Sequence, residues 1–422
     1  MSSPVKTVTP IPPVAKRANR QRPLFLTGVL LGAVAEQVVL FALPLLIFQK
    51  TNDVALLGLA YAIEWLPALL AYPFAGLIAD RDGGPRLFSV VTAGRSVVLI
   101  LALAGCLLLS DWQTPILMSC GALLALLLAP VHMAIEKVVP QVATGKDLPK
   151  TQGLVQSMEV SAMAVGPALA LLGVMFFDKI MLLGVAAAVF MAAACCWLPI
   201  PRGPRAAKPG TARETMAELG LGWKLLARSK PLVLLAGLNF SINLVFGTAL
   251  SANAALVTDV FDGPESAFAL LNVSIGVVGL VNLLAIPFLL RFFDVRVIGV
   301  VGLAILCACL VVLGFAPSLL IYGPAFVVSM VGVTYFNVYN RTQRIRVIAP
   351  EHLGKVMGPF YMINLLAAPL GGLLLAGLGT SLGPQSLIAI SAIALSGVAA
   401  VLLPLTMRSF HRALNGQTTS SR

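Results

Sequence analysis

The chain has 422 residues, of which 59% are hydrophobic and 11% are charged, and its mean hydropathy is +0.95. One water-soluble core cannot hold that much apolar surface, so the composition excludes a soluble domain and indicates a multi-pass membrane protein. The net charge of +12 would suit a nucleic-acid-binding protein. The basic residues lie at the ends of apolar segments, however, where membrane topology explains them better, and we expect no nucleic-acid partner.

Apolar runs of about twenty residues recur along the chain. Lipid cannot hydrogen-bond a peptide group, so such runs are expected to cross the membrane as helices. The predicted fold is all-α, with twelve transmembrane helices at 24–48, 56–78, 87–109, 114–131, 150–176, 180–198, 231–257, 267–290, 297–315, 318–336, 356–378 and 385–406. The predicted organisation is a tail (1–23), a six-helix bundle (24–200), a basic linker (201–230), a second six-helix bundle (231–406) and a tail (407–422).

The basic residues predict the orientation of these helices, because cytoplasmic loops collect Lys and Arg. Of the 29 basic residues, 26 lie at the termini and at the loops that follow even-numbered spans, whereas Lys50 and Lys179 lie on the opposite side. Both termini are therefore predicted to be cytoplasmic. The linker contains an amphipathic stretch at 214–226.

Acidic residues inside the first two spans are the first functional candidates. Glu36 lies about 18 Å into the first span at the rise of a helix, close to the midplane. Burial favours the neutral form of a carboxyl group, so Glu36 is the leading candidate for proton coupling. Gln37 is a candidate substrate contact, and an acid held by Gln37 for packing alone is the alternative. Glu64, in the second span, is a further candidate for proton coupling.

The turn after the second span reads Gly-Leu-Ile-Ala-Asp-Arg-Asp-Gly-Gly-Pro-Arg over residues 76–86. It resembles the signature of the major facilitator superfamily, which is Gly, three residues, Asp-Arg, any residue, Gly and then a basic residue. The signature residues of this chain are Gly76, Asp80, Arg81, Gly83 and Arg86. The basic residue comes late, because Gly84-Pro85 occupies positions that are usually basic. We expect this loop to pair with helix ends across the two halves and to stabilise an outward-facing state, without contacting substrate.

The third and fifth spans contain further polar side chains. Arg95 lies within the third span, and Gln152, Gln156 and Glu159 share one face of the fifth because they are four and three residues apart. This face predicts a polar cavity, with Gln156 as a substrate contact and Glu159 as a second proton-coupling candidate. A satisfied interhelical network is the alternative. Arg95 and Glu159 lie at similar depths, so Arg95 is the candidate buried charge partner, with Glu159 as its expected acid.

The second half contains amides where the first half has buried acids. Asn239 and Asn243 are four residues apart on the seventh span, and they are candidates for substrate binding or, equally, for bonds between helices. The three histidines, His132, His352 and His411, are expected to lie solvated near the cytoplasmic face. No buried acid is predicted in this half, so proton handling is expected in the first.

Other segments are similar to the bacterial exporters of drugs and siderophores within the superfamily. The run from Gly32 to Glu36 followed by Phe41-Ala-Leu-Pro resembles their first helix, and Val347 to Met357 resembles their second half. The fifth span contains Gly166-Pro167 of the motif associated with antiporters, but lacks its trailing glycines. This resemblance implies the export of a siderophore or an amphiphilic drug, and it implies that the membrane is the inner membrane of a bacterium.

The function that these patterns predict is secondary active transport, most simply the proton-coupled efflux of a small molecule by alternating access between two halves. Uptake by a symporter or facilitator of the same fold is the alternative, and a membrane sensor or lipid-modifying enzyme is a third hypothesis that no catalytic constellation supports. The chain lacks a phosphate-binding loop of the Gly-x4-Gly-Lys-Ser/Thr type, so ATP is not the expected energy source. We expect a monomer with no enzymatic activity, cofactor or metal, whose partners are substrate, protons and membrane lipids.

Overall fold

The computed structural model describes residues 14–51, 54–203 and 211–420, and these residues form helices joined by short turns. The N-terminal half comprises α1 (Val14–Thr51), α2 (Val54–Asp82), α3 (Pro85–Leu108), α4 (Gln113–Val142), α5 (Asp147–Phe176) and α6 (Leu182–Trp197). The C-terminal half comprises α8 (Lys230–Ala255), α9 (Glu265–Phe292), α10 (Val295–Phe315), α11 (Leu319–Val347), α12 (Leu353–Leu382) and α13 (Pro384–Ser420). The amphipathic stretch of the linker forms α7 (Ala212–Arg228). Four single turns complete the helical structure, η1 (Ser110–Trp112), η2 (Lys179–Met181), η3 (Leu256–Val260) and η4 (Pro350–His352).

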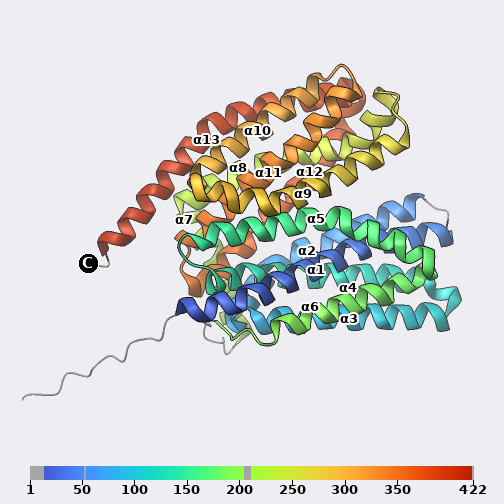
Figure 1. The fold of residues 1–422 in the computed structure, drawn as a ribbon, viewed down its shortest axis with the longest axis horizontal. Helices are drawn as coiled ribbons and strands as arrows, with labels where there is room; N and C mark the ends of the chain where they lie inside the picture. Colours follow the sequence, from blue (N-terminus) through green and yellow to red (C-terminus); the bar gives the residue numbers. More distant parts are fainter. Residues whose placement is uncertain (1–13, 52–53, 204–210, 421–422) are drawn as a thin grey trace, which may run out of the picture.

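The two halves lie side by side along the long axis of the molecule (Figure 1). Eleven of the segments in the described residues are long and apolar enough to cross a membrane. The start of α1, the linker helix α7 and the end of α13 lie at the same end of the bundle, on the left of Figure 1. We refer to this end, which also carries the α2–α3 turn, as the signature end.

The fourth and tenth predicted spans end too early. They were expected to stop at residues 131 and 336, but α4 continues to Val142 and α11 to Val347. A span predicted from hydropathy stops where the apolar segment gives way to charged residues. A helix, however, continues as long as its backbone is hydrogen-bonded and its polar side chains find partners. Both extensions run towards the signature end, and they carry charged residues that contact the opposite half.

Small residues allow the two halves to approach closely. A methyl group on Gly76 of α2 would collide with the carbonyl oxygen of Gly354 of α12. On the other side of the interface, Gly276 and Gly279 of α9 pack directly against α5. Glycine at such positions brings helix backbones into contact, which favours association where lipid provides no hydrophobic driving force. The interface therefore consists of two close helix pairs, α2 with α12 and α5 with α9.

An aromatic cluster fixes the packing of the N-terminal half. Trp197 at the end of α6 is fully buried, stacks on Phe88 with ring centroids 3.8 Å apart, and donates a hydrogen bond from Nε1 to the carbonyl oxygen of Phe25. Gly28 leaves the space that the indole occupies. These contacts hold α1, α3 and α6 together on the side of the bundle away from the C-terminal half, so α1 and α3 form a fixed wall for the cavity described next.

Candidate functional site

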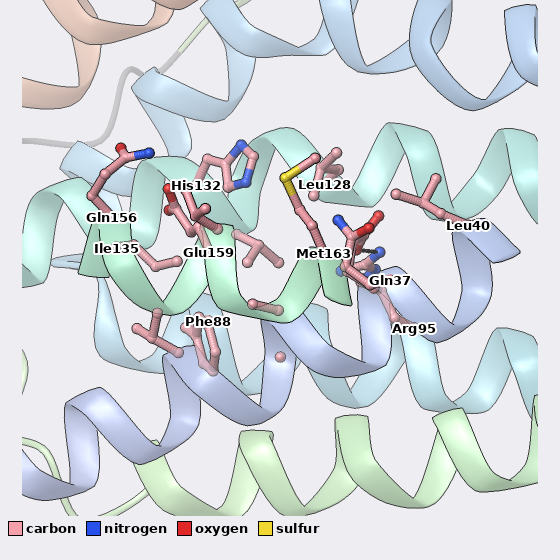
Figure 2. Close-up of a pocket in the computed structure, with 16 residues that line it drawn as sticks. Gln37, Leu40, Phe88, Arg95, Leu128, His132, Ile135, Gln156, Glu159 and Met163 are labelled. Atoms are coloured by element: carbon pink, nitrogen blue, oxygen red, sulfur yellow. Dashed lines mark hydrogen bonds and ion pairs between the residues drawn. The ribbon is translucent and has the colours of Figure 1, made fainter. Parts of the chain in front are cut away.

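A cavity of about 370 Å³ lies within the N-terminal half, lined by residues of α1, α3, α4 and α5. In Figure 2, Arg95 and Gln37 lie towards one end of this cavity, and His132, Glu159 and Gln156 lie towards the other. The rest of the wall is mostly apolar. The cavity brings together five residues that the sequence singled out, namely Glu36, Gln37, Arg95, Gln156 and Glu159.

The first ion pair of the cavity joins Glu36 to Arg95. Arg95 Nη2 donates to Glu36 Oε2, and the Arg95 side chain is only 1% exposed. The guanidinium also lies over the ring of Phe190, 4.3 Å from its centroid, an arrangement that stabilises a desolvated cation. The expected pairing of Arg95 with Glu159 is therefore wrong. Similar depth does not fix the direction in which a side chain points, and the rotation of α3 directs Arg95 towards Glu36 of α1.

The second ion pair joins Glu159 to Arg341 of α11, so it crosses between the two halves. Two parallel hydrogen bonds form it, from Arg341 Nη1 to Oε1 at 3.2 Å and from Nη2 to Oε2 at 2.7 Å. Such bidentate pairing fixes orientation as well as adding energy. Arg341 lies beyond the predicted end of its span, which is why the sequence did not identify it as the partner.

The two glutamines on the predicted polar face of α5 differ in their surroundings. Gln156 lines the cavity, with its Oε1 left without a hydrogen-bond partner among the described residues. Gln152 is fully buried, and both atoms of its amide lack a partner there. A buried amide without a partner is costly, so these groups are ones that a ligand or water would satisfy.

His132 is a cavity residue that the sequence assigned wrongly. It was expected to be solvated near a membrane surface, but it lines the cavity on α4, and its Nδ1 lies 2.6 Å from the hydroxyl oxygen of the buried Tyr72. The predicted fourth span ended at residue 131, and this boundary alone placed His132 outside. His132 lies four residues before Glu136, so the two side chains share one face of a helix. This spacing was the sequence signal that could have identified His132 as a buried polar residue.

A second group of charges at the signature end joins the halves. Tyr361 of α12 donates from its hydroxyl to Glu136 Oε1 at 2.6 Å, and Arg344 Nη2 donates to the same oxygen at 3.3 Å. The guanidinium of Arg344 lies 4.6 Å from the ring centroid of Phe360. Glu136 and Arg344 are 4% and 3% exposed, so this pair is desolvated. The sequence missed it, although acids on α4 and arginines on α11 occupy corresponding extensions of the two halves.

Asp80 of the signature caps the start of α12. Its carboxylate accepts the backbone N–H groups of Gly354 at 2.8 Å and Lys355 at 2.7 Å, and it accepts a third bond from Lys137 Nζ at 2.6 Å. Lys137 also donates to the carbonyl oxygen of Pro350. A carboxylate at a helix N-terminus is stabilised by the unpaired N–H groups there. The expected capping across the halves is thus present in the structure.

The remaining signature residues shape the turn and connect it to the linker. Arg81 Nη2 lies 3.3 Å from Glu218 Oε2 of α7, and Glu218 Oε1 lies 3.4 Å from Lys355 Nζ, so α7 bridges the two halves. Gly83 and Gly84 have positive φ angles of 89° and 104°, which explains why glycine replaces a basic residue at position 84. Arg86 is exposed on the first turn of α3.

The amides of the C-terminal half bond to one another. Asn239 donates to Asn364 Oδ1 at 2.8 Å and accepts from Asn340 at 2.8 Å, and Asn243 donates to the backbone carbonyl of Asn364 at 3.2 Å. Neither Asn239 nor Asn243 is among the residues that line the cavity. Of the two interpretations of these residues, the bonds between helices are the ones present in this conformation. Glu64 belongs to α2, but its side chain lies outside the described residues.

The family model described as the Major Facilitator Superfamily matches residues 25–344. The chain belongs to this superfamily. Its members are transporters, and the chain is accordingly a multi-pass membrane transporter of this all-helical fold. No curated protein matches the chain in sequence.

Solved structures of other superfamily members share the fold. The human organic anion transporter MFSD10 (TETRAN) is similar with a TM-score of 0.73 and 15% identity over 94% of this chain and 100% of that one. A bacterial homologue of the iron transporter ferroportin, in an outward-facing state, has a TM-score of 0.70 and 17% identity, covering 96% and 100%. The E. coli fucose:proton symporter FucP has a TM-score of 0.74 and 12% identity, covering 92% and 99%. At these identities the likeness concerns the fold, and the substrate and the direction of transport need separate arguments.

Proposed function

We propose that the protein is a proton-coupled exporter of a small molecule that works by alternating access. In this proposal, α1–α6 and α8–α13 are twelve membrane spans, and the signature end faces the cytoplasm of a bacterium with the inner membrane around the bundle. The distribution of basic residues supports this orientation. The positions of the start of α1, α7 and the end of α13 at one end support it as well (Figure 1).

The observation that carries the proposal is a charged cavity in one half, next to ionic contacts that fasten the two halves at the signature end. Glu159 belongs to both features, because it lines the cavity and pairs with Arg341 of the other half. Opening the signature end requires this pair to separate. A ligand in the cavity can therefore change the energy of the closed state, as alternating access requires. With the signature end cytoplasmic, the present conformation corresponds to an outward-facing state.

The lining favours an amphiphilic substrate. Apolar side chains such as Leu128 and Met163 provide most of the wall, and Gln37, Gln156 and the Glu36–Arg95 pair provide polar groups. A site of this kind suits a molecule with an aromatic or aliphatic body and a few polar groups. Siderophores and amphiphilic drugs are the substrate classes that the sequence resemblance implies. Export of either class is the proposed activity, and the protein would act as a transporter without enzymatic chemistry.

The energy of one proton is sufficient for such export. Moving one charge down ~100 mV supplies about 2.3 kcal/mol, which corresponds to a substrate gradient of roughly 50-fold. Glu36 and Glu159 are both bonded to arginines in this state. Coupling at Glu36, the leading candidate from the sequence, therefore requires Arg95 to release it in another state of the cycle. Glu64 stays a candidate on sequence grounds.

Proton release from reconstituted vesicles tests the proposal. Vesicles that contain the protein and a trapped pH indicator would receive ethidium or a metal-free catecholate siderophore, with protein-free vesicles as the control. Substrate movement opposite to proton movement is the expected result, whereas movement of both in the same direction would favour the uptake symporter. Glu36→Gln tests the leading candidate from the sequence: loss of coupled transport with intact membrane insertion would support a coupling role for Glu36, and unchanged pH-driven efflux would contradict that role.

A further inference from the structure

The ionisable groups of the cavity differ in the kind of partner that they have. Glu36 and Glu159 are each bonded to an arginine, which keeps its charge at any physiological pH. His132, which with Glu36, Glu159 and Arg95 makes up the ionisable residues of the lining, is instead bonded to the neutral hydroxyl of Tyr72. Imidazole is the side chain that most often binds and releases protons in proteins near neutral pH.

His132 is connected to the other half of the molecule through two tyrosines. Tyr72 of α2 bonds to His132, and its ring stacks on Tyr361 of α12, with centroids 5.4 Å apart and an angle of 7° between the planes. Tyr361 in turn donates to Glu136, one helical turn after His132 on α4. The four residues form a ring of contacts that closes across the interface between the halves.

We propose that His132 is the proton-binding residue of the transport cycle, and that the Tyr72–Tyr361 stack connects its charge to the closure of the signature end. The inference rests on the proposed proton-coupled function and assigns the proton to a residue outside the predicted acids. Its basis is geometric, because His132 is the cavity residue that combines contact with the cavity, a neutral partner and a direct path to the opposite half.

Charged and titratable groups reach His132 from every helix packed around it. They are Glu36 of α1, Tyr72 of α2, Arg95 of α3, Glu136 of α4 itself, Glu159 of α5, Arg341 of α11 and Tyr361 of α12. Glu36 pairs with Arg95, Glu159 with Arg341 and Glu136 with Arg344, so these charges largely cancel around the ring. A proton added to His132 therefore introduces the net positive charge of the site.

The proton step needs no other reactant. Neutral imidazole has one N–H and one unprotonated nitrogen. In the tautomer with the proton on Nε2, Nδ1 accepts the hydrogen bond from the Tyr72 hydroxyl. A proton from water in the cavity that binds at Nδ1 makes both nitrogens donors, so Nδ1 donates to the Tyr72 oxygen and the Tyr72 hydroxyl proton must turn to another acceptor. The imidazolium also attracts Glu159 and thereby competes with Arg341. Protonation from the outside thus loosens the contacts at the signature end, and the proton leaves to cytoplasmic water after that end opens.

Proton binding can be measured without any substrate. Replacing His352 and His411 by Gln leaves His132 as the sole histidine of the three, so the ¹⁵N signals of labelled histidine in lipid nanodiscs report this ring alone. We expect a single titration with a midpoint between about pH 5 and pH 8, and Tyr72→Phe should shift the midpoint. A ring that keeps one protonation state from pH 5 to pH 8 would overturn the proposal.

Transport provides the second test. Vesicles loaded with ethidium and placed in a medium one pH unit more acidic should lose ethidium faster for the wild type and for the control His411→Gln. His132→Gln, which preserves a hydrogen-bonding group for Tyr72, should lose this acceleration, measured as the ratio of its own ethidium loss with and without the pH difference, while it keeps the wild-type melting temperature. Full acceleration in His132→Gln overturns the inference. If His132 titrates while wild-type ethidium loss ignores the gradient, the proposed function fails and the proton site stands.

Discussion

The two halves share one helical plan but place their polar groups differently. The N-terminal half contains a cavity with two acids, an arginine and a histidine, whereas the amides Asn239, Asn340 and Asn364 of the C-terminal half bond to one another. From its signature end the C-terminal half supplies Arg341 and Arg344, which pair with acids of the other half. The comparison teaches that one half holds the ionic site, while the other supplies the arginines that fasten it at the signature end.

Removing the buried guanidinium of Arg95 should have the largest effect. Arg95→Ala would leave Glu36 as a partly buried acid without its partner, and breaking a buried pair in this way typically costs about 3–5 kcal/mol. We expect a large loss of thermal stability in detergent, with the exposed Lys146→Ala of the α4–α5 turn as the control. If Arg95→Ala melts like the wild type, the ionic site is not a structural requirement of the N-terminal half.

A variant that weakens the Asp80 cap at the start of α12 tests whether this cap helps to close the signature end. Asp80→Asn removes a charge that accepts two backbone N–H groups and holds Lys137, so Lys137 is left buried without its acid. We expect transport to slow by roughly tenfold, equivalent to about 1.4 kcal/mol of altered barrier. Substrate preference should be unchanged, because Asp80 lies outside the cavity lining, and competition between two substrates measures it. A changed preference would contradict a purely conformational role.

The ion pair between cavity and opposite half can be isolated by a double-mutant cycle. Glu159→Gln, Arg341→Gln and the double variant should give a coupling energy of about 1–2 kcal/mol, because the pair is bidentate but partly exposed. Thermal unfolding in nanodiscs measures the energy, and cross-linking between α5 and α11 measures separation of the halves. Additive effects of the two single variants would mean that the pair does not fasten the halves.

The amide network should give the smallest effect. Asn239→Ala removes two hydrogen bonds between helices, and such bonds in membrane proteins average about 0.6 kcal/mol each. We expect a small loss of stability and unchanged substrate affinity, whereas Gln156→Ala in the cavity should weaken substrate binding. The Michaelis constants of the two variants for one transported probe make the comparison. A weakened affinity in Asn239→Ala would give the C-terminal half a part in binding.

The tertiary structure changed which residues pair with one another more than it changed which residues are candidates for the functional site. Glu36, Arg95 and Glu159 were recognisable because a charge within an apolar run demands an explanation. Their pairing depends on how each helix is rotated about its axis, and hydropathy carries no information about that angle. His132, Glu136 and Arg341 were missed for another reason, since they lie on helical extensions that begin where the apolar signal ends.

The sequence by itself determined a multi-pass helical transporter fold, because lipid leaves a long apolar segment few options besides a helix. It also determined the signature turn, whose glycines and aspartate are required by local backbone geometry and helix capping. Only the tertiary structure decided that Glu36 pairs with Arg95, that Glu159 reaches across to Arg341, and that His132 faces the cavity. These contacts join residues far apart in the chain, and they follow from the packing of whole helices against one another.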